Sequence, residues 1–361
     1  MIGYRSLLNL DEQPHWTVFL SDFALPAADR HRLQRQVEQC ASRLLFIRID
    51  RGVRDVLRKM RSAGAGLRSD YFSLQAVVCR HENLALLDAL VERLPRRDLA
   101  RIDVPILECG FRRSYATHAL RVVMGADYGE QDRISDYFFS LLAKREPYEV
   151  TVETAGGTLQ VRDNRPWFEL AGRLRSGETR TLPDGEVAYS AEIKNPRDEV
   201  EGQFLVDGAV LPLAQEPRFA ADARRLLPLS REVGRHPFRI HIRRGTVVNV
   251  TGSGRGPGAM SDFFDKSEMY RRINEVGIAF NRASTRFIHG WPAASNEVRP
   301  GAHLGIGGAA NPDDDDPQRS PFVHLDCIAA DCSIYVNGQP FLRAFGSRSA
   351  RRLELRAVAQ R

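Results

Sequence analysis

The chain of 361 residues lacks an apolar run long enough to cross a membrane, which takes about 18 consecutive apolar residues. The residues from Met1 to Arg5 also lack the apolar core of a signal peptide. We therefore expect a protein of the cytoplasm that has no membrane partner.

Cysteine is scarce, and its spacing is irregular. The five cysteines are an odd number without C-x-x-C spacing, namely Cys40, Cys79, Cys109, Cys327 and Cys332. This pattern argues against both a disulfide scaffold and a structural zinc knuckle. We expect reduced thiols.

Phosphate-binding loops are also missing. No G-x-G-x-x-G or Walker-type motif follows any strand-like segment, and the small-residue stretch from Ala63 to Gly66 is not followed by Lys-Ser or Lys-Thr. Nothing in the sequence therefore supports nucleotide binding.

Lysine is rare, so the net charge of +6 comes almost entirely from arginines spread along the chain among 46 acidic residues. No basic stretch is interleaved with aromatic residues, as a base-stacking surface would require. The composition thus predicts no nucleic-acid partner.

The first part of the chain alternates strand-like and helical patterns, which is typical of an α/β domain with a largely parallel sheet. The expected strands are Trp16–Asp22, Arg43–Asp50, Phe72–Cys79 and Ile102–Cys109, and the expected helices are Pro26–Arg43, Val53–Arg61, Asn83–Leu94 and Gln131–Lys144.

From Tyr148 the pattern changes to short alternating runs separated by glycine turns, which indicates a β-rich α+β domain. We predict domains at 1–147 and 148–361. In the second we expect a flexible glycine-rich segment at Gly252–Gly258 and a helix over Ser261–Asn274.

Four polar residues lie in short apolar segments near the end of the chain. His324 and Asp326 are two positions apart in a strand-like run, so both side chains point to one face, whereas Cys327 points away. His303 and Glu275 lie in further runs bounded by small residues. Imidazoles and carboxylates suit zinc, cobalt, manganese or iron(II), so we predict a metal site.

Four motifs together resemble the aminopeptidase T and aminopeptidase S metallopeptidases. They are L-P-D-G-E-V, which ends on Glu186 and Val187, then E-V-G-I-A-F-N, G-A-H-L-G-I-G and S-P-F-V-H-L-D. The resemblance covers about residues 148 to 345. It implies that Glu186, Glu275, His303, His324 and Asp326 bind two divalent metals, that Glu186 and Glu275 are catalytic, and that the protein forms a homodimer.

Three functions remain open. A two-metal aminopeptidase would activate water to remove N-terminal residues from peptides. The related iron(II) 2,5-dihydroxypyridine dioxygenases, which this chain resembles in size, use two histidines and one aspartate, here His303, His324 and Asp326, on a small-molecule substrate. A peptide-binding protein without catalysis is the third, because the segment from Ala309 to Asp316 lacks the tyrosine common in the aminopeptidases.

Overall fold

The computed structural model describes residues 16–39, 43–49, 52–63, 72–77, 83, 86, 89–90, 93, 100–101, 113–172, 185–190, 199–214, 220–289, 294–307 and 323–344. The chain divides into two compact units. Unit 1 comprises 1–132, 171–185 and 293–295, and unit 2 comprises 133–170, 186–292 and 296–361. The boundary expected near residue 148 remains a prediction.

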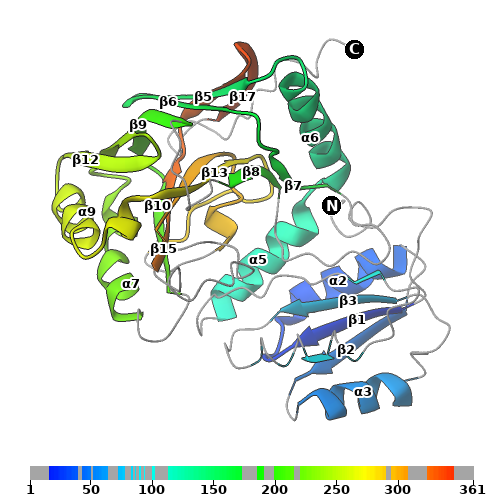
Figure 1. Ribbon diagram of the computed structural model, residues 1–361. Coiled ribbons are helices and arrows are strands. Elements are labelled where there is room, and N and C mark those ends of the chain that lie inside the picture. The colour runs from blue at the N-terminus through cyan, green and yellow to red at the C-terminus, as the bar shows by residue number, and fades with distance from the viewer. Residues whose placement is uncertain are drawn as a thin grey trace. The chain divides into compact units, whose positions relative to one another are not determined.

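Unit 1 contains the parallel sheet that the strand and helix alternation predicts (Figure 1). Its described strands are ordered β2-β1-β3-β4, and every pair is parallel. The strands are β1 (Trp16–Ser21), β2 (Arg43–Arg48), β3 (Phe72–Val77) and β4 (Ala100–Arg101). The helices are α2 (Ala27–Gln39), α3 (Val53–Ser62), α5 (Arg113–Gly125) and the first residues of α6 (Tyr128–Leu142).

Parallel neighbours need a crossover between them, and α2 provides the one between β1 and β2. Helix α3 connects β2 to β3, which pairs with the other edge of β1. Val18, Leu20 and Ile47 of the sheet pack with Val56 and Met60 of α3 in one apolar cluster. The strand expected at Ile102–Cys109, and most of the helix expected at Asn83–Leu94, lie outside the described residues.

Unit 2 is built on two antiparallel sheets, which agrees with the predicted β-rich domain. Over the described residues one sheet has the order β12-β11-β9-β6-β5-β16-β17 and the other has the order β10-β15-β14-β13-β8-β7. The first comprises β5 (Tyr148–Thr154), β6 (Gly157–Asp163), β9 (Val200–Val206), β11 (Phe238–Arg243), β12 (Thr246–Gly252), β16 (Cys332–Val336) and β17 (Gln339–Ala344). The second comprises β7 (Phe168–Leu170), β8 (Glu186–Ser190), β10 (Ala209–Ala214), β13 (Ile273–Ala279), β14 (Gly301–Gly307) and β15 (Val323–Ala329).

Unit 2 contains α6 from Arg133 onward and three shorter helices, α7 (Ala220–Leu226), α8 (Leu229–Glu232) and α9 (Gly256–Phe264), with the 3-10 turn η2 (Glu268–Arg271). The 3-10 turn η3 (Ala294–Asn296) begins in unit 1 and ends in unit 2. No helix among the described residues combines the length and the apolar character needed to cross a bilayer.

The bounds predicted for the helix before Glu275 were wrong. The helix expected over Ser261–Asn274 begins earlier, at Gly256, and ends at Phe264. Pro257 lies in its first turn, where proline's fixed φ favours helix and its missing N–H is harmless, so the last residues of the glycine-rich segment start the helix. The flexibility expected at Gly252–Gly258 stays a prediction. Ser267 then accepts a hydrogen bond from the Met269 nitrogen and opens η2, and β13 follows.

Candidate metal centre

Every predicted ligand lies on one face of the six-stranded sheet. β14 pairs with β15 so that Gly305 lies opposite Asp326 and Gly307 opposite His324. Side chains alternate along a strand, so His303, two positions before Gly305, projects on the same side as His324 and Asp326. This arrangement confirms that His303 comes from the strand next to the H-x-D pair.

The next two strands extend the same face. In β13, Glu275 lies opposite Gly305 and Gly277 opposite His303. In β8, Glu186 lies opposite Ala279, which is two positions beyond Gly277. The alternation therefore places Glu275 and Glu186 with the histidines.

Glycine makes room on this face for the two imidazole rings. A Cβ at Gly277 would overlap the His303 ring, and a Cβ at Gly305 would lie 2.8 Å from His324 Cε1 and 2.7 Å from Glu275 Cβ. Both distances are shorter than real Cβ contacts. In the motifs E-x-G and H-x-G, the glycine two positions after one ligand therefore leaves space for the imidazole of another ligand.

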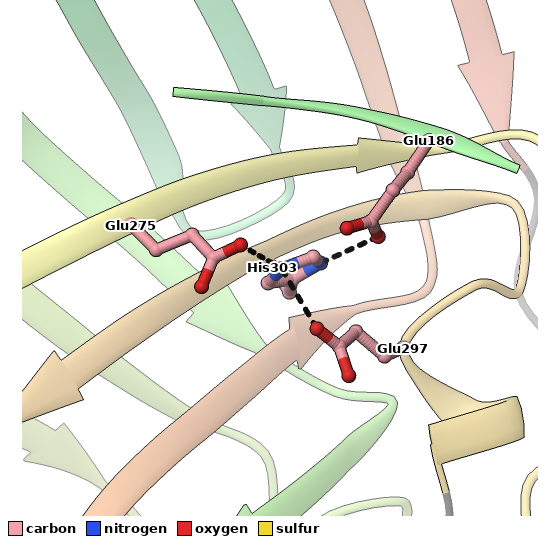
Figure 2. A group of neighbouring side chains, drawn as sticks. All are labelled: Glu186, Glu275, Glu297 and His303. Atoms are coloured by element: carbon pink, nitrogen blue, oxygen red, sulfur yellow. Dashed lines mark ion pairs between the residues drawn. The ribbon is translucent and has the colours of Figure 1, made fainter. Parts of the chain in front are cut away.

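The first ligand group surrounds His303 (Figure 2). Glu186, Glu275 and Glu297 point at the ring from three directions. Nδ1 lies 4.0 Å from Glu186 Oε2, and Nε2 lies 3.8 Å from Glu275 Oε1 and 3.6 Å from Glu297 Oε1. These distances exceed those of hydrogen bonds, so the group encloses a space in which an ion could lie between the donor atoms.

The second group consists of Glu275, His324 and Asp326. His324 Nε2 lies 2.8 Å from Asp326 Oδ1 and 3.7 Å from Glu275 Oε2. Glu275 thus belongs to both groups, with one carboxylate oxygen toward each histidine.

Burial and mutual repulsion shift the pKa values of the acidic residues. Burial raises the pKa of Glu186 to about 7; the positive charge of His303 opposes this rise, and the charges of Glu275 and Asp326 add to it. Burial and then the charges of Asp326 and Glu186 raise the pKa of Glu297 well above its usual range. Without a cation, burial and the neighbouring carboxylates therefore favour the protonated form of both carboxyl groups.

The opposite charges at the centre of the site have the reverse effect. Burial raises the pKa of Glu275, but the contact with His303 and the charges of His303 and His324 outweigh burial and lower it. Burial lowers the pKa of His303, yet Glu275, Glu186 and Glu297 together raise it well above normal. One imidazolium thus balances only part of the negative charge.

Among the described residues, four buried atoms of the ligand side chains have no hydrogen-bond partner: both ring nitrogens of His303, Glu186 Oε2 and Asp326 Oδ2. Unsatisfied buried polar atoms are costly, and these four lie in or beside the two ligand groups. Their chemistry, imidazole nitrogen and carboxylate oxygen, fits a divalent metal.

The structure brings together all five sequence-predicted ligands and adds Glu297, which sequence analysis missed. Glu297 follows η3 in an irregular segment, so no strand or helix period marks it. The only signal is its position six residues before His303. Cys327 belongs to neither ligand group and is fully buried, as the strand alternation predicts.

Comparison with known proteins gives a likeness at the level of the fold. No family model matches the chain, and no curated protein matches it. Among solved structures, the 2,5-dihydroxypyridine dioxygenase from Pseudomonas putida KT2440 superposes with a TM-score of 0.52 at 12% sequence identity, covering 93% of this chain and 92% of that chain. The two proteins share a fold, whereas the aminopeptidase side of the resemblance finds no support in these comparisons.

Proposed function

We propose that this sheet face is a centre for two divalent metal ions that share Glu275, and that the protein is a metal-dependent hydrolase acting on peptides with a free N-terminus. The observation that carries this proposal is the position of Glu275, whose two oxygens lie 3.8 Å from His303 Nε2 and 3.7 Å from His324 Nε2. A carboxylate placed between two imidazoles suits the bridging role in a two-metal site.

The residues divide between the two ion positions. Glu186 and His303 would hold one ion, His324 and Asp326 the other, and Glu275 both. Ions bound there would supply Lewis-acid chemistry, lowering the pKa of a water molecule and polarising a carbonyl group. The buried strands β14 and β15 keep the ligands in a rigid, water-poor environment.

Glu297 is the best candidate to move a proton. Its side chain is 22% exposed, against 13% for Glu275 and 5% for Glu186, and it extends from an irregular segment instead of a strand. A carboxylate at the open side of the site can take the proton of an attacking water at an Oε atom and pass it to the leaving amine.

Glu297→Gln tests this role. We expect the variant to retain its metal and to lose hydrolysis by about a hundredfold or more, in the range of general acid–base catalysis. Loss of metal in parallel with activity would instead make Glu297 a ligand.

A mononuclear iron(II) dioxygenase is the second candidate, and the fold of the dihydroxypyridine dioxygenase favours it. His303, His324 and Asp326 would hold the iron, which would supply open positions for dioxygen and an aromatic diol. In the structure His303 lies in one ligand group and the H-x-D pair in the other, so the ligand geometry favours two ions.

Metal content decides between the candidates. Protein purified without chelator should hold two ions per chain under the hydrolase proposal, one iron under the dioxygenase alternative, and none if the protein only binds peptides. Release of N-terminal residues from a peptide panel, and dioxygen uptake with iron(II) and a dihydroxypyridine, measure the corresponding activities.

Glu275→Gln and Glu186→Gln provide the sharper test. Each amide keeps the shape of the side chain but removes a charge needed to neutralise two ions, so we expect metal content to fall towards one ion and hydrolysis to disappear while the fold is kept. A variant that keeps full metal content and activity would contradict the two-ion centre.

A further inference from the structure

Asn274 is a buried amide at an irregularity of β13. The pairing of β13 with β14 shifts register between Ile273 and Glu275, which takes Asn274 out of the regular ladder. The residue is 4% exposed, and its side-chain nitrogen lies 3.2 Å from His324 Nδ1. A Cβ at Gly305 would lie 2.7 Å from Asn274 Oδ1, so this glycine also leaves space for the amide.

The two nitrogens of His324 therefore face different partners. Nε2 lies 2.8 Å from Asp326 Oδ1, an oxygen that can accept a hydrogen bond from Nε2–H. The proton of a neutral ring then sits on Nε2, and Nδ1 accepts from the amide nitrogen of Asn274. In this tautomer Nε2 has no lone pair for a metal.

We propose that Asn274 is a positioning residue that hydrogen-bonds His324 Nδ1 in either tautomer of the ring, and so supports the tautomer whose Nε2 can bind a metal, an inference that rests on the proposed metal centre. A half-turn of the amide about χ2 presents oxygen in place of nitrogen, so the same side chain can accept from Nδ1–H. The ring then loses the proton on Nε2, gains one on Nδ1 and keeps its charge, and the Nε2 lone pair faces Glu275 and Asp326.

The choice of asparagine follows from these two states. An aspartate at this position could only accept a hydrogen bond from Nδ1–H, and an apolar residue could neither donate to Nδ1 nor accept from Nδ1–H. Metal-binding histidines commonly donate their second N–H to an oxygen acceptor, and loss of that acceptor typically weakens metal affinity about 10- to 100-fold.

Imidazole NMR of the metal-free protein tests the hydrogen bond directly. With ¹⁵N-labelled histidine, the His324 signals assigned through His324→Gln, and a pH at which the His324 ring is neutral, wild type should show no proton on Nδ1, whereas Asn274→Asp should show one. Addition of zinc should move the wild-type proton to Nδ1. Equal protonation of Nδ1 in metal-free wild type and Asn274→Asp would overturn the proposal.

Zinc affinity tests the consequence. Asn274→Leu should bind zinc about 10- to 100-fold more weakly, and Asn274→Asp should restore affinity to within a few-fold of wild type. Asn337→Asp, in the turn between β16 and β17, makes the same change of charge where the amide contacts the Leu141 carbonyl instead of a ligand. We expect no change in zinc affinity for this control.

The outcomes separate this inference from the proposed function. If wild type binds no metal, the proposed metal centre fails, and the NMR comparison of wild type with Asn274→Asp still decides the role of Asn274. If wild type binds zinc and folded Asn274→Leu binds it equally well, the positioning role fails while the metal centre stands. Should Asn274→Leu not fold, the Asn274→Asp comparison carries the test.

Discussion

The surroundings of Asp207 raise the pKa of its carboxyl group and so make the stability of the folded protein depend on pH. It lies in the turn between β9 and β10, where Oδ1 accepts a hydrogen bond of 2.6 Å from the Ala330 nitrogen. Burial raises its pKa from 3.8 to about 6, the Ala330 hydrogen bond opposes the rise, and the charge of Asp331 adds to it. The folded protein therefore holds this proton more tightly than the unfolded chain.

The direction of the pH effect follows from that difference. Between about pH 4 and pH 6 the folded state binds more protons at Asp207, so its contribution to the free energy of unfolding falls as pH rises. In the variant Asp207→Asn the side-chain amide cannot ionise but still offers an oxygen to the Ala330 nitrogen. We predict that the variant gains stability relative to wild type across this window, by at most about 3 kcal/mol, and that the difference is constant above pH 7.

Urea unfolding of both proteins at pH 4, 5, 6 and 7 measures this effect. Asp262→Asn, at an exposed position of α9, controls for removal of one charge. A difference between Asp207→Asn and wild type that does not change with pH would contradict the assignment.

Regular secondary structure explains which site residues the sequence could predict. His324 and Asp326 share a face because strand periodicity is two, and that periodicity is visible in the sequence. Asn274 escaped prediction because the register shift in β13 breaks the period, and Glu297 escaped because its segment has none. Both residues reach the site through tertiary structure that local patterns do not encode.

At the scale of elements, β13 and β14 hold the site because each carries a glycine where a neighbouring strand brings a bulky ring. Gly277 lies opposite His303, and Gly305 lies between Glu275 and Asp326 on the adjacent strands. A side chain at either glycine would occupy the space of a ring or of another ligand. The strands can therefore be close-packed and still present large polar side chains on one face.

We predict that Gly277→Ala and Gly305→Ala each displace a histidine. The added methyl group would overlap His303 in the first variant and lie 2.8 Å from His324 Cε1 in the second. Overpacking of this kind costs about 1 to 3 kcal/mol, so we expect lower thermal stability and weaker zinc binding, measured by calorimetry.

Gly258→Ala is the matched control, because a Cβ at Gly258 meets nothing within 4 Å. That position lies in helix α9, where alanine is the better helix former. Equal effects of all three alanines on zinc binding would show that the glycines do not shape the site.

At the scale of the whole molecule, the order of the chain does not follow the two compact units. The segments 171–185 and 293–295 belong to unit 1 although most of the chain around them belongs to unit 2. Within unit 1, Gln131 accepts a hydrogen bond from the Gly172 nitrogen at 3.1 Å. A linear sequence suggests a single boundary, because local composition cannot reveal that a later segment returns to an earlier unit.

Sequence analysis assigned the whole of α6 to the N-terminal domain. Its residues from Arg133 onward instead make contacts within unit 2. The Phe138 ring lies 4.9 Å from that of Trp167 and 5.2 Å from that of Phe341. Asn337 donates a hydrogen bond to the Leu141 carbonyl at 2.8 Å. Residues 143–147, between α6 and β5, are exposed.

We predict that cutting the chain in this exposed turn leaves one particle. A recognition sequence for a site-specific protease, inserted after Arg145, should be cleaved readily because the turn is exposed to solvent. The two pieces should remain together in size-exclusion chromatography, since Phe138 stays packed against Trp167 and Phe341 while segment 171–185 completes unit 1. Phe138→Ala should weaken their association, because loss of a buried phenylalanine costs about 3 to 5 kcal/mol. Separation of the cleaved wild-type pieces without denaturant would mean that residues 1–145 fold apart from the rest of the chain, as a simple boundary near residue 148 requires.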